Sequence, residues 1–211
     1  MKLKVSEKAG SVTAELTEPK KMKALFTFAH GAGAPMNHPF MTTMSKELEK
    51  LGIGTLRFNF PYMENKKGRP DVPAVAHATI EAVANYIHKE FPKTPLFLSG
   101  KSFGGRMSSQ YLAKFAPDFI KGIAFFGFPL HAPGSPSVDR ADHLRDIKVP
   151  MLFLQGTRDS LADMGLMTQL TKELPSSTLV KFDGADHSFK AGKKNLLPEL
   201  AQAVADWVTK S

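Results

Sequence analysis

Apolar residues in this chain gather into short runs that are separated by segments of helical periodicity. Six runs rich in apolar side chains lie at residues 24–29, 55–60, 95–98, 120–128, 151–155 and 178–182. Between most of them, apolar side chains recur at intervals of three and four, as on one face of a helix. Buried strands that alternate with helices are typical of a mostly parallel sheet covered by helices on both faces. We therefore predict an α/β fold with this architecture.

The N-terminal segment departs from this pattern. Apolar and charged side chains alternate at residues 3–5, a turn is expected at residues 8–10, and the alternation resumes at residues 12–16. A period of two predicts an antiparallel hairpin with one face in water. The chain has 211 residues and no repeat or linker-like segment. We therefore expect a single domain over residues 1–211.

Charge and hydropathy limit the classes of partner. The formal net charge is +8 at pH 7, but the basic residues form short, scattered clusters without interleaved aromatic residues. We therefore expect solvated surface charge and no nucleic-acid partner. No apolar run approaches the roughly 20 residues that span a membrane, and the first residues lack the apolar core of a signal peptide. No membrane partner is expected.

The chain contains no cysteine. It therefore has no disulfide, no thiol nucleophile and no cysteine-based metal site, which is compatible with the cytoplasmic location that we predict. Histidine-based metal patterns are missing as well. There is no H-E-x-x-H, and no histidine pair spaced three to five apart is accompanied by carboxylates on a helix. We expect neither a metal nor another cofactor.

One turn carries a nucleophile motif. Residues 100–104 read Gly-Lys-Ser-Phe-Gly, which fits G-x-S-x-G, and they lie between the apolar run at 95–98 and a helical pattern that includes Met107. Strand, tight turn and helix form the context in which this motif holds a serine on a strained turn. Glycine is needed on both sides because a side chain would collide with the neighbouring strand or helix. Ser102 is the predicted nucleophile, although an ordinary strand-to-helix turn also favours serine and glycine.

Two further polar residues follow strands later in the chain. Asp159 comes just after the run at 151–155, and His187 just after the run at 178–182. Parallel strands place their carboxyl ends at one edge of the sheet, where ligands bind. A histidine near neutral pH can take the proton of a serine hydroxyl when a carboxylate holds its imidazole. The chain order Ser102, Asp159, His187 therefore predicts a catalytic triad.

Each member also has a simpler interpretation. Asp159 can be the N-cap of the helix that follows it, and His187 can be a solvated loop residue. Asp163, Asp183 and Asp186 are competing acids, but Asp186 directly precedes His187, and adjacent side chains in an extended loop usually point apart. Three such residues together at strand ends favour the triad, with Asp159 as the acid.

An oxyanion hole needs two backbone N–H groups near the nucleophile. The N–H of Phe103 follows Ser102 and lies at the start of a helix, where the dipole favours negative charge. The small-residue loop at residues 30–35 is expected to supply the second donor, with Ala32 preferred over Gly33. His30 is expected to support this loop by hydrogen bonding rather than to take part in catalysis.

These motifs resemble the α/β-hydrolase superfamily, in particular its small dienelactone-hydrolase-like members. Segments 29–34, 100–106 and 184–189 are similar to a subgroup that contains a testis-expressed protein and a subunit of a chromatin acetyltransferase complex. The resemblance implies an α/β-hydrolase fold, with Ser102 as nucleophile, Asp159 as acid, His187 as base, and the N–H groups of Ala32 and Phe103 as oxyanion hole. The dienelactone hydrolases use cysteine as nucleophile, so their substrate is not inherited.

The resemblance also bears on the substrate. The connection at residues 129–149 is too short for the large helical cap that many relatives carry, so we expect an open site. Met36, Tyr62, Met63 and Phe128 are candidate substrate-binding walls, with ordinary packing as the alternative. The expected function is that of a carboxylesterase-like serine hydrolase acting on a small-molecule ester or thioester, as a monomer or weak homodimer. A hydrolase-like binding scaffold and a cofactor-free perhydrolase are the alternatives.

Overall fold

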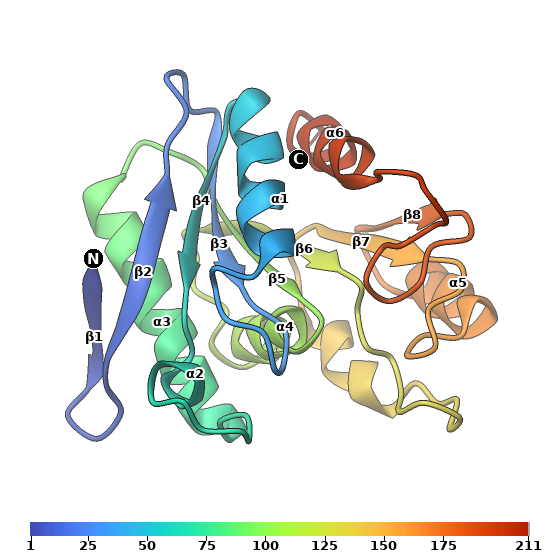
Figure 1. Cartoon of the computed structure of the whole chain (residues 1–211), viewed down its shortest axis with the longest axis horizontal. Helices are drawn as coiled ribbons and strands as arrows, with labels where there is room; N and C mark the ends of the chain where they lie inside the picture. The colour runs from blue at the N-terminus through green and yellow to red at the C-terminus, as the bar shows by residue number, and fades with distance from the viewer. Residues whose placement is uncertain (211) are drawn as a thin grey trace.

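A sheet of eight strands forms the centre of the computed structural model, which describes residues 1–210. The strands are β1 (Lys2–Ser6), β2 (Gly10–Thr17), β3 (Ala24–Ala29), β4 (Ile53–Phe58), β5 (Leu96–Lys101), β6 (Ile120–Phe126), β7 (Met151–Gly156) and β8 (Ser177–Phe182). Their order across the sheet is β1-β2-β4-β3-β5-β6-β7-β8 (Figure 1). β2 is antiparallel to both β1 and β4, whereas all pairings from β4 to β8 are parallel.

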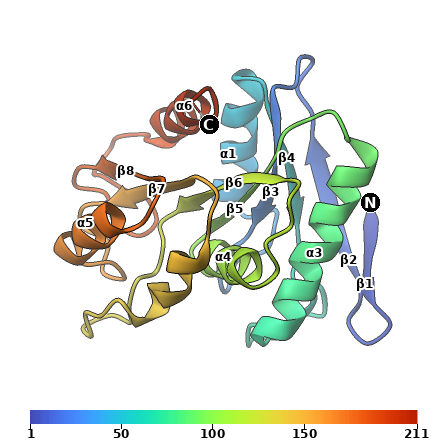
Figure 2. The same ribbon diagram turned by 180° about the vertical axis from the view of Figure 1, so that it is seen from behind.

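Helices cover both faces of this sheet, as Figure 1 and the reverse view in Figure 2 show. They are α1 (Pro39–Lys50), α2 (Pro61–Glu64), α3 (Pro73–Glu90), α4 (Phe103–Phe115), α5 (Met164–Glu173), α6 (Leu197–Val208) and the 3-10 helix η1 (Asp139–Asp146). α1 and α6 pack on one face, and α3, α4 and α5 pack on the other. The predicted α/β architecture with an N-terminal antiparallel hairpin is therefore confirmed.

The sheet separates two apolar cores because successive side chains on a strand point to opposite faces. On β3, Phe26 and Phe28 join the core under α1 and α6, whereas Leu25 and Ala29 join the core under α3 and α4. Every residue of β3 is buried, as is every residue of β4 and β7. Burial on both faces explains why β3 and β7 read as nearly continuous apolar runs.

Two strands end earlier in the structure than the sequence predicted. β4 ends at Phe58, two residues before the predicted end, because Pro61 already begins the short helix α2. β6 ends at Phe126 rather than at residue 128, because Gly127 adopts a positive φ of 71° that leaves the extended conformation. Both errors lie at the carboxyl edge of the sheet, where the chain turns towards the candidate site.

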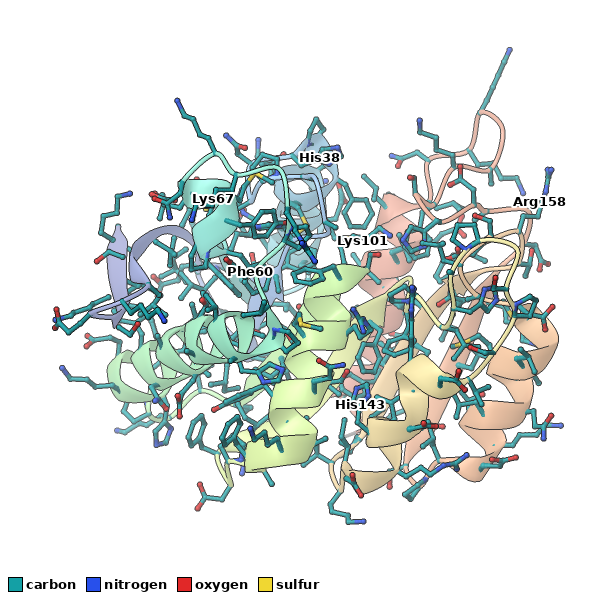
Figure 3. The ribbon with its side chains drawn as sticks, turned by 90° about the horizontal axis from the view of Figure 1, so that it is seen from below. His38, Phe60, Lys67, Lys101, His143 and Arg158 are labelled. Carbon is teal, nitrogen blue, oxygen red and sulfur yellow. The ribbon has the colours of Figure 1, made fainter. Side chains whose placement is uncertain are left out.

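The connections at this edge are short. The segment between β6 and β7 contains η1 and turns, and it forms no separate cap domain. Within residues 1–210, no helix combines the length and the apolar character needed to cross a membrane. The parallel strands are therefore followed at their carboxyl ends by loops and short helices such as α2 rather than by a cap domain, and Figure 3 views the molecule towards this edge.

Packing against β5 gives a first prediction. The ring of Phe97 is 3% exposed, stacks on Phe26 at a centroid distance of 4.9 Å and meets the ring of Trp207 edge-on at 5.4 Å. The Phe97→Ala substitution is therefore expected to lower the free energy of unfolding by about 3–5 kcal/mol in urea titrations. Phe115, at the end of α4, is 49% exposed, so Phe115→Ala should cost less than about 1 kcal/mol. Equal losses in the two variants would contradict the assignment of Phe97 to the core.

Candidate active site

Ser102 lies in the turn between β5 and α4, in a backbone conformation that non-glycine residues rarely adopt. Its φ is 49° and its ψ is −115°. The turn is held on both sides, since Ser102 N donates to Phe126 O at 3.2 Å and Arg106 N donates to Ser102 O at 3.1 Å. The serine side chain does not cap α4. The strained turn therefore leaves the hydroxyl group available for another partner.

Two glycines make this turn possible. A Cβ atom on Gly100 would lie 2.4 Å from Gly105 N, and one on Gly104 would lie 2.5 Å from Ala29 O. β5 therefore touches the first turn of α4, and that turn touches the end of β3, with backbone against backbone. The expected steric need for glycine on both sides of Ser102 is confirmed.

The structure joins Ser102, His187 and Asp159 through hydrogen bonds. His187 Nε2 lies 2.8 Å from Ser102 Oγ, and His187 Nδ1 lies 2.7 Å from Asp159 Oδ2. The Asp159 side chain is fully buried, whereas that of His187 is 23% exposed. This arrangement allows the imidazole to take a proton from the serine hydroxyl while the carboxylate fixes the imidazole's tautomer.

The other acidic residues near His187 have different partners. Asp163 Oδ1 accepts from Leu166 N at 2.9 Å and caps α5, so the capping role considered for Asp159 belongs to Asp163. Asp186 Oδ1 accepts from Ser188 N and Lys190 N, which fixes the turn that carries His187. Asp183 is exposed. Among residues 1–210, Asp159 is the acid that meets the histidine.

Asp159 is oriented by a residue that the sequence analysis missed. Gln155 Nε2 donates to Asp159 Oδ2 at 2.6 Å, and Gln155 Oε1 accepts from Phe128 N at 2.9 Å. Leu161 N donates to the second carboxylate oxygen at 2.8 Å. Gln155 is fully buried. The available signal was an amide side chain at the end of an otherwise apolar strand.

Lys101, inside the motif itself, holds the loop that carries His187. Its Nζ donates to His187 O at 2.6 Å and lies 5.5 Å from the ring centroid of Phe189. Burial lowers the pKa of Lys101 to about 8, while the charges of Asp159 and Asp186 oppose this shift. Lys101 is labelled near the middle of the edge in Figure 3. The sequence offered no role for this lysine because its partner lies 86 residues away.

The loop after β3 lies against the strand-to-helix turn that carries Ser102, which we call the elbow. A Cβ on Gly31 would be 3.7 Å from Ser102 Cβ. His30 supports this loop as expected: its Nε2 accepts from Phe60 N at 3.0 Å, and its Nδ1 donates to Gly31 O at 2.8 Å. Among the described residues, the Ala32 N–H has no protein partner. The Phe103 N–H, at the first position of α4, has none within the helix.

Three of the four expected substrate-binding residues lie in the core. Tyr62 and Phe128 are each 1% exposed and Met36 is 8% exposed, so they support the loops rather than offer a surface. They were predicted to contact substrate because they are apolar and lie near strand ends, but an apolar residue at such a position can equally pack in the core. Met63 is half-buried and keeps some exposed surface. A groove of about 1070 Å³, lined by residues such as Lys21, lies elsewhere and contains none of the site residues.

A second Ser–His contact does not form a comparable site. Ser109 Oγ lies 2.7 Å from His143 Nε2, but Ser109 is fully buried and also donates to Arg106 O at 2.9 Å. Burial lowers the pKa of His143 to about 4, and the charge of Arg106 adds to this effect. Among residues 1–210, no carboxylate bonds to His143, and no group of three His, Asp or Glu residues could hold a metal ion.

His30 gives a prediction about acid stability. Burial lowers its pKa from 6.5 to about 4, so folding favours the neutral ring. The unfolded chain then binds the extra proton below pH 6.5, and the stabilisation present above that pH is lost as the pH falls to 4. The loss is on the order of 3 kcal/mol for this residue. His30→Asn should therefore weaken the fall in unfolding free energy between pH 7 and pH 4.5.

The exposed His88 provides the control for this experiment. His88→Asn should retain the wild-type dependence of unfolding free energy on pH. His143, whose pKa is lowered in the same direction, should leave part of the dependence in the His30 variant. An unchanged dependence in His30→Asn would show that the buried ring does not resist protonation.

Comparison with known proteins bears on the family and the fold. Residues 22–209 match the model of a family described as an α/β hydrolase domain. The fold resembles an α/β serine hydrolase homologue from Coxiella burnetii, with 23% identity, a TM-score of 0.77, and coverage of 98% of this chain and 96% of that one.

Two further solved structures are similar over almost the whole chain. A lidless α/β serine hydrolase from Xanthomonas campestris has 22% identity and a TM-score of 0.77, covering 100% of this chain and 93% of that one. A dienelactone hydrolase from Anabaena variabilis has 18% identity and a TM-score of 0.78, covering 100% and 95%. At these identities the likeness concerns the fold alone.

Proposed function

Because the chain belongs to the α/β-hydrolase domain family, we propose that it is a serine hydrolase that cleaves a carboxylic ester or thioester through an acyl-enzyme. The observation that carries this proposal is the continuous hydrogen-bonded path from Ser102 through His187 to Asp159. A serine in a strained turn, a partly exposed histidine and a fully buried carboxylate have the properties that nucleophilic catalysis requires.

In the proposed reaction, Ser102 Oγ attacks the carbonyl carbon while His187 Nε2 takes the hydroxyl proton. The tetrahedral intermediate collapses, and the imidazolium returns the proton to the leaving alcohol or thiol. Water then attacks the acyl-enzyme with His187 again as base, which releases the acid and restores the serine. Asp159 keeps the proton on Nδ1 and stabilises the imidazolium.

The N–H groups of Phe103 and Ala32 are the proposed oxyanion hole. Two observations support them. The loop that carries Ala32 lies against the turn at Ser102. The Ala32 N–H has no hydrogen-bond partner among the described residues, and the Phe103 N–H has none within α4. The N-terminal end of α4 adds a partial positive charge where the oxyanion would form.

The described part of the chain forms no cap domain, which supports a site that is open to its substrate. The half-buried Met63 and Phe103 are the proposed apolar contacts beside Ser102. We also propose, from the three motifs alone, membership of the subgroup with the testis-expressed protein and the acetyltransferase-complex subunit. This subgroup also suggests the alternative function, a hydrolase-like binding scaffold without catalysis. In such a scaffold Ser102 would not need to be reactive.

A fluorophosphonate probe tests the proposal directly. The wild-type protein should be labelled at Ser102, as located by mass spectrometry, and should hydrolyse short-chain p-nitrophenyl esters. Both reactions should be lost in Ser102→Ala and reduced at least about hundredfold in His187→Ala. Correctly folded wild-type protein that neither reacts with the probe nor turns over these esters would favour the scaffold.

The acid is tested by a matched pair of substitutions. Asp159→Asn should lower kcat about hundredfold or more, because the amide no longer enforces the productive tautomer of His187. Asp186→Asn keeps an oxygen acceptor for the Ser188 and Lys190 N–H groups, so its kcat should stay within about threefold of wild type. The reverse outcome would identify Asp186 as the acid.

Lys101 is proposed as a positioning residue for His187. Lys101→Met removes the donor to His187 O but keeps a long apolar stem, so kcat should fall about tenfold while the fold is retained. The wild-type activity should decline above about pH 8 as the ammonium loses its proton, and this alkaline limb should be missing in the variant. Lys67→Met, on an exposed loop, is the control. A normal kcat and pH profile in Lys101→Met would contradict the role.

A further inference from the structure

We propose that Arg106 and Arg140 form a subsite for a carboxylate group of the substrate, so that the ester cleaved at Ser102 carries an anionic group close to its scissile bond. This inference rests on the proposed hydrolase function and names its substrate class. No part of the proposed triad or oxyanion hole uses either arginine, although both lie on elements that meet at the site.

The packing of α4 against η1 places the two arginines opposite each other. The 2.7 Å contact between Ser109 Oγ and His143 Nε2 joins these helices (Figure 3 labels His143). Residues three apart lie on the same face of a 3-10 helix, and residues three or four apart lie on the same face of an α-helix. Arg140 and Arg106 each precede one of the two joined residues by three positions. Both arginines therefore lie one turn before the joined residues, close enough for the charge of Arg140 to act on the Arg106 guanidinium group.

Arg106 is within reach of the proposed nucleophile. It lies four residues after Ser102 and donates its backbone N–H to Ser102 O at 3.1 Å. Four residues rise by about 6 Å along a helix, and helical side chains lean back towards the N-terminus. The extended side chain of Arg106 can therefore bring its guanidinium group to the level of the Ser102 hydroxyl.

Arg140 is fixed to the loop that carries the proposed acid. Its Nη1 donates to His131 O at 3.0 Å, and His131 N donates to Leu161 O at 3.0 Å. Leu161 N in turn donates to Asp159 Oδ1 at 2.8 Å. The Arg140 guanidinium group is thus tied to the Asp159 end of the Ser102–His187–Asp159 path, and the Arg106 backbone is tied to the Ser102 end.

The two charges have no counterion within the described part of the chain. Neither arginine takes part in an ion pair among residues 1–210, and the Arg106 side chain has no hydrogen-bond partner there. Both are half-buried, and burial together with the charge of Arg140 lowers the pKa of Arg106. By contrast, the buried Arg57 is paired with Glu15. Two adjacent, partly desolvated guanidinium groups attract an anion, and their geometry matches a carboxylate.

Two matched ester pairs test this subsite. The first is p-nitrophenyl hemiglutarate, with an anionic acyl group, against p-nitrophenyl pentanoate; the second is 4-acetoxybenzoate, with an anionic leaving group, against phenyl acetate. Wild-type kcat/KM should favour the anionic member of at least one pair by about tenfold after correction for intrinsic reactivity. Arg106→Gln and Arg140→Gln should each remove most of this preference while changing kcat/KM for the neutral member less than about threefold.

Arg145→Gln is the matched control, since Arg145 also lies on η1 but is exposed and paired with Glu173. It should leave the preference intact. Binding of the same four esters to Ser102→Ala, by calorimetry, gives a readout that needs no catalysis, and Arg106→Gln in that background should abolish tighter binding of the anionic ester. Equal binding and equal turnover within both pairs would overturn the subsite. Anion-selective binding without any turnover by the wild type would instead overturn the hydrolase function.

Discussion

The close backbone approach around Ser102 is the constraint on which the rest of the site depends. Gly100 lets β5 meet the first turn of α4, and Gly104 lets that turn touch the end of β3. A serine at a φ of 49° persists only where its surroundings over-determine the turn. The same contact brings the loop that follows β3 next to the nucleophile. The relative positions of the proposed oxyanion donors and the serine hydroxyl group therefore depend on this one backbone contact. A side chain at either glycine would therefore disturb both together.

The remaining parts of the site come from strands that are far apart in sequence, and buried polar residues tie them to the elbow. Gln155 orients Asp159, Lys101 holds the carbonyl of His187, and His30 bridges the end of β4 and the loop after β3. Such groups lose hydration on burial, so their net contribution to stability is small even when they are fully bonded. Their effect is to allow one arrangement of the loops and to exclude others, because any other arrangement would leave a buried donor or acceptor unpaired.

These ties explain how far the sequence could predict the structure. The alternation of apolar runs and helices was sufficient for the architecture, and the positions of Ser102, Asp159 and His187 after strands were sufficient to place them at one edge. Gln155 and Lys101 were missed because their partners depend on how strands pair, which spacing along the chain does not encode. Tyr62 and Phe128 were misplaced for a related reason. Apolar side chains at strand ends have the same pattern whether they face a cleft or a core, and only packing distinguishes them.

The open edge of the sheet also limits how this site can select a substrate. With η1 and turns in place of a cap, an apolar ligand gains little from enclosure, so selectivity has to come from directed polar contacts. The net charge of +8 supplies a diffuse attraction for anions that is screened beyond about 8–10 Å at physiological salt. Half-buried charges such as those of Arg106 and Arg140 are screened less, because part of their surroundings has a low dielectric constant. Selectivity that survives high salt therefore belongs to the arginine pair, whereas any part that salt removes belongs to the surface as a whole.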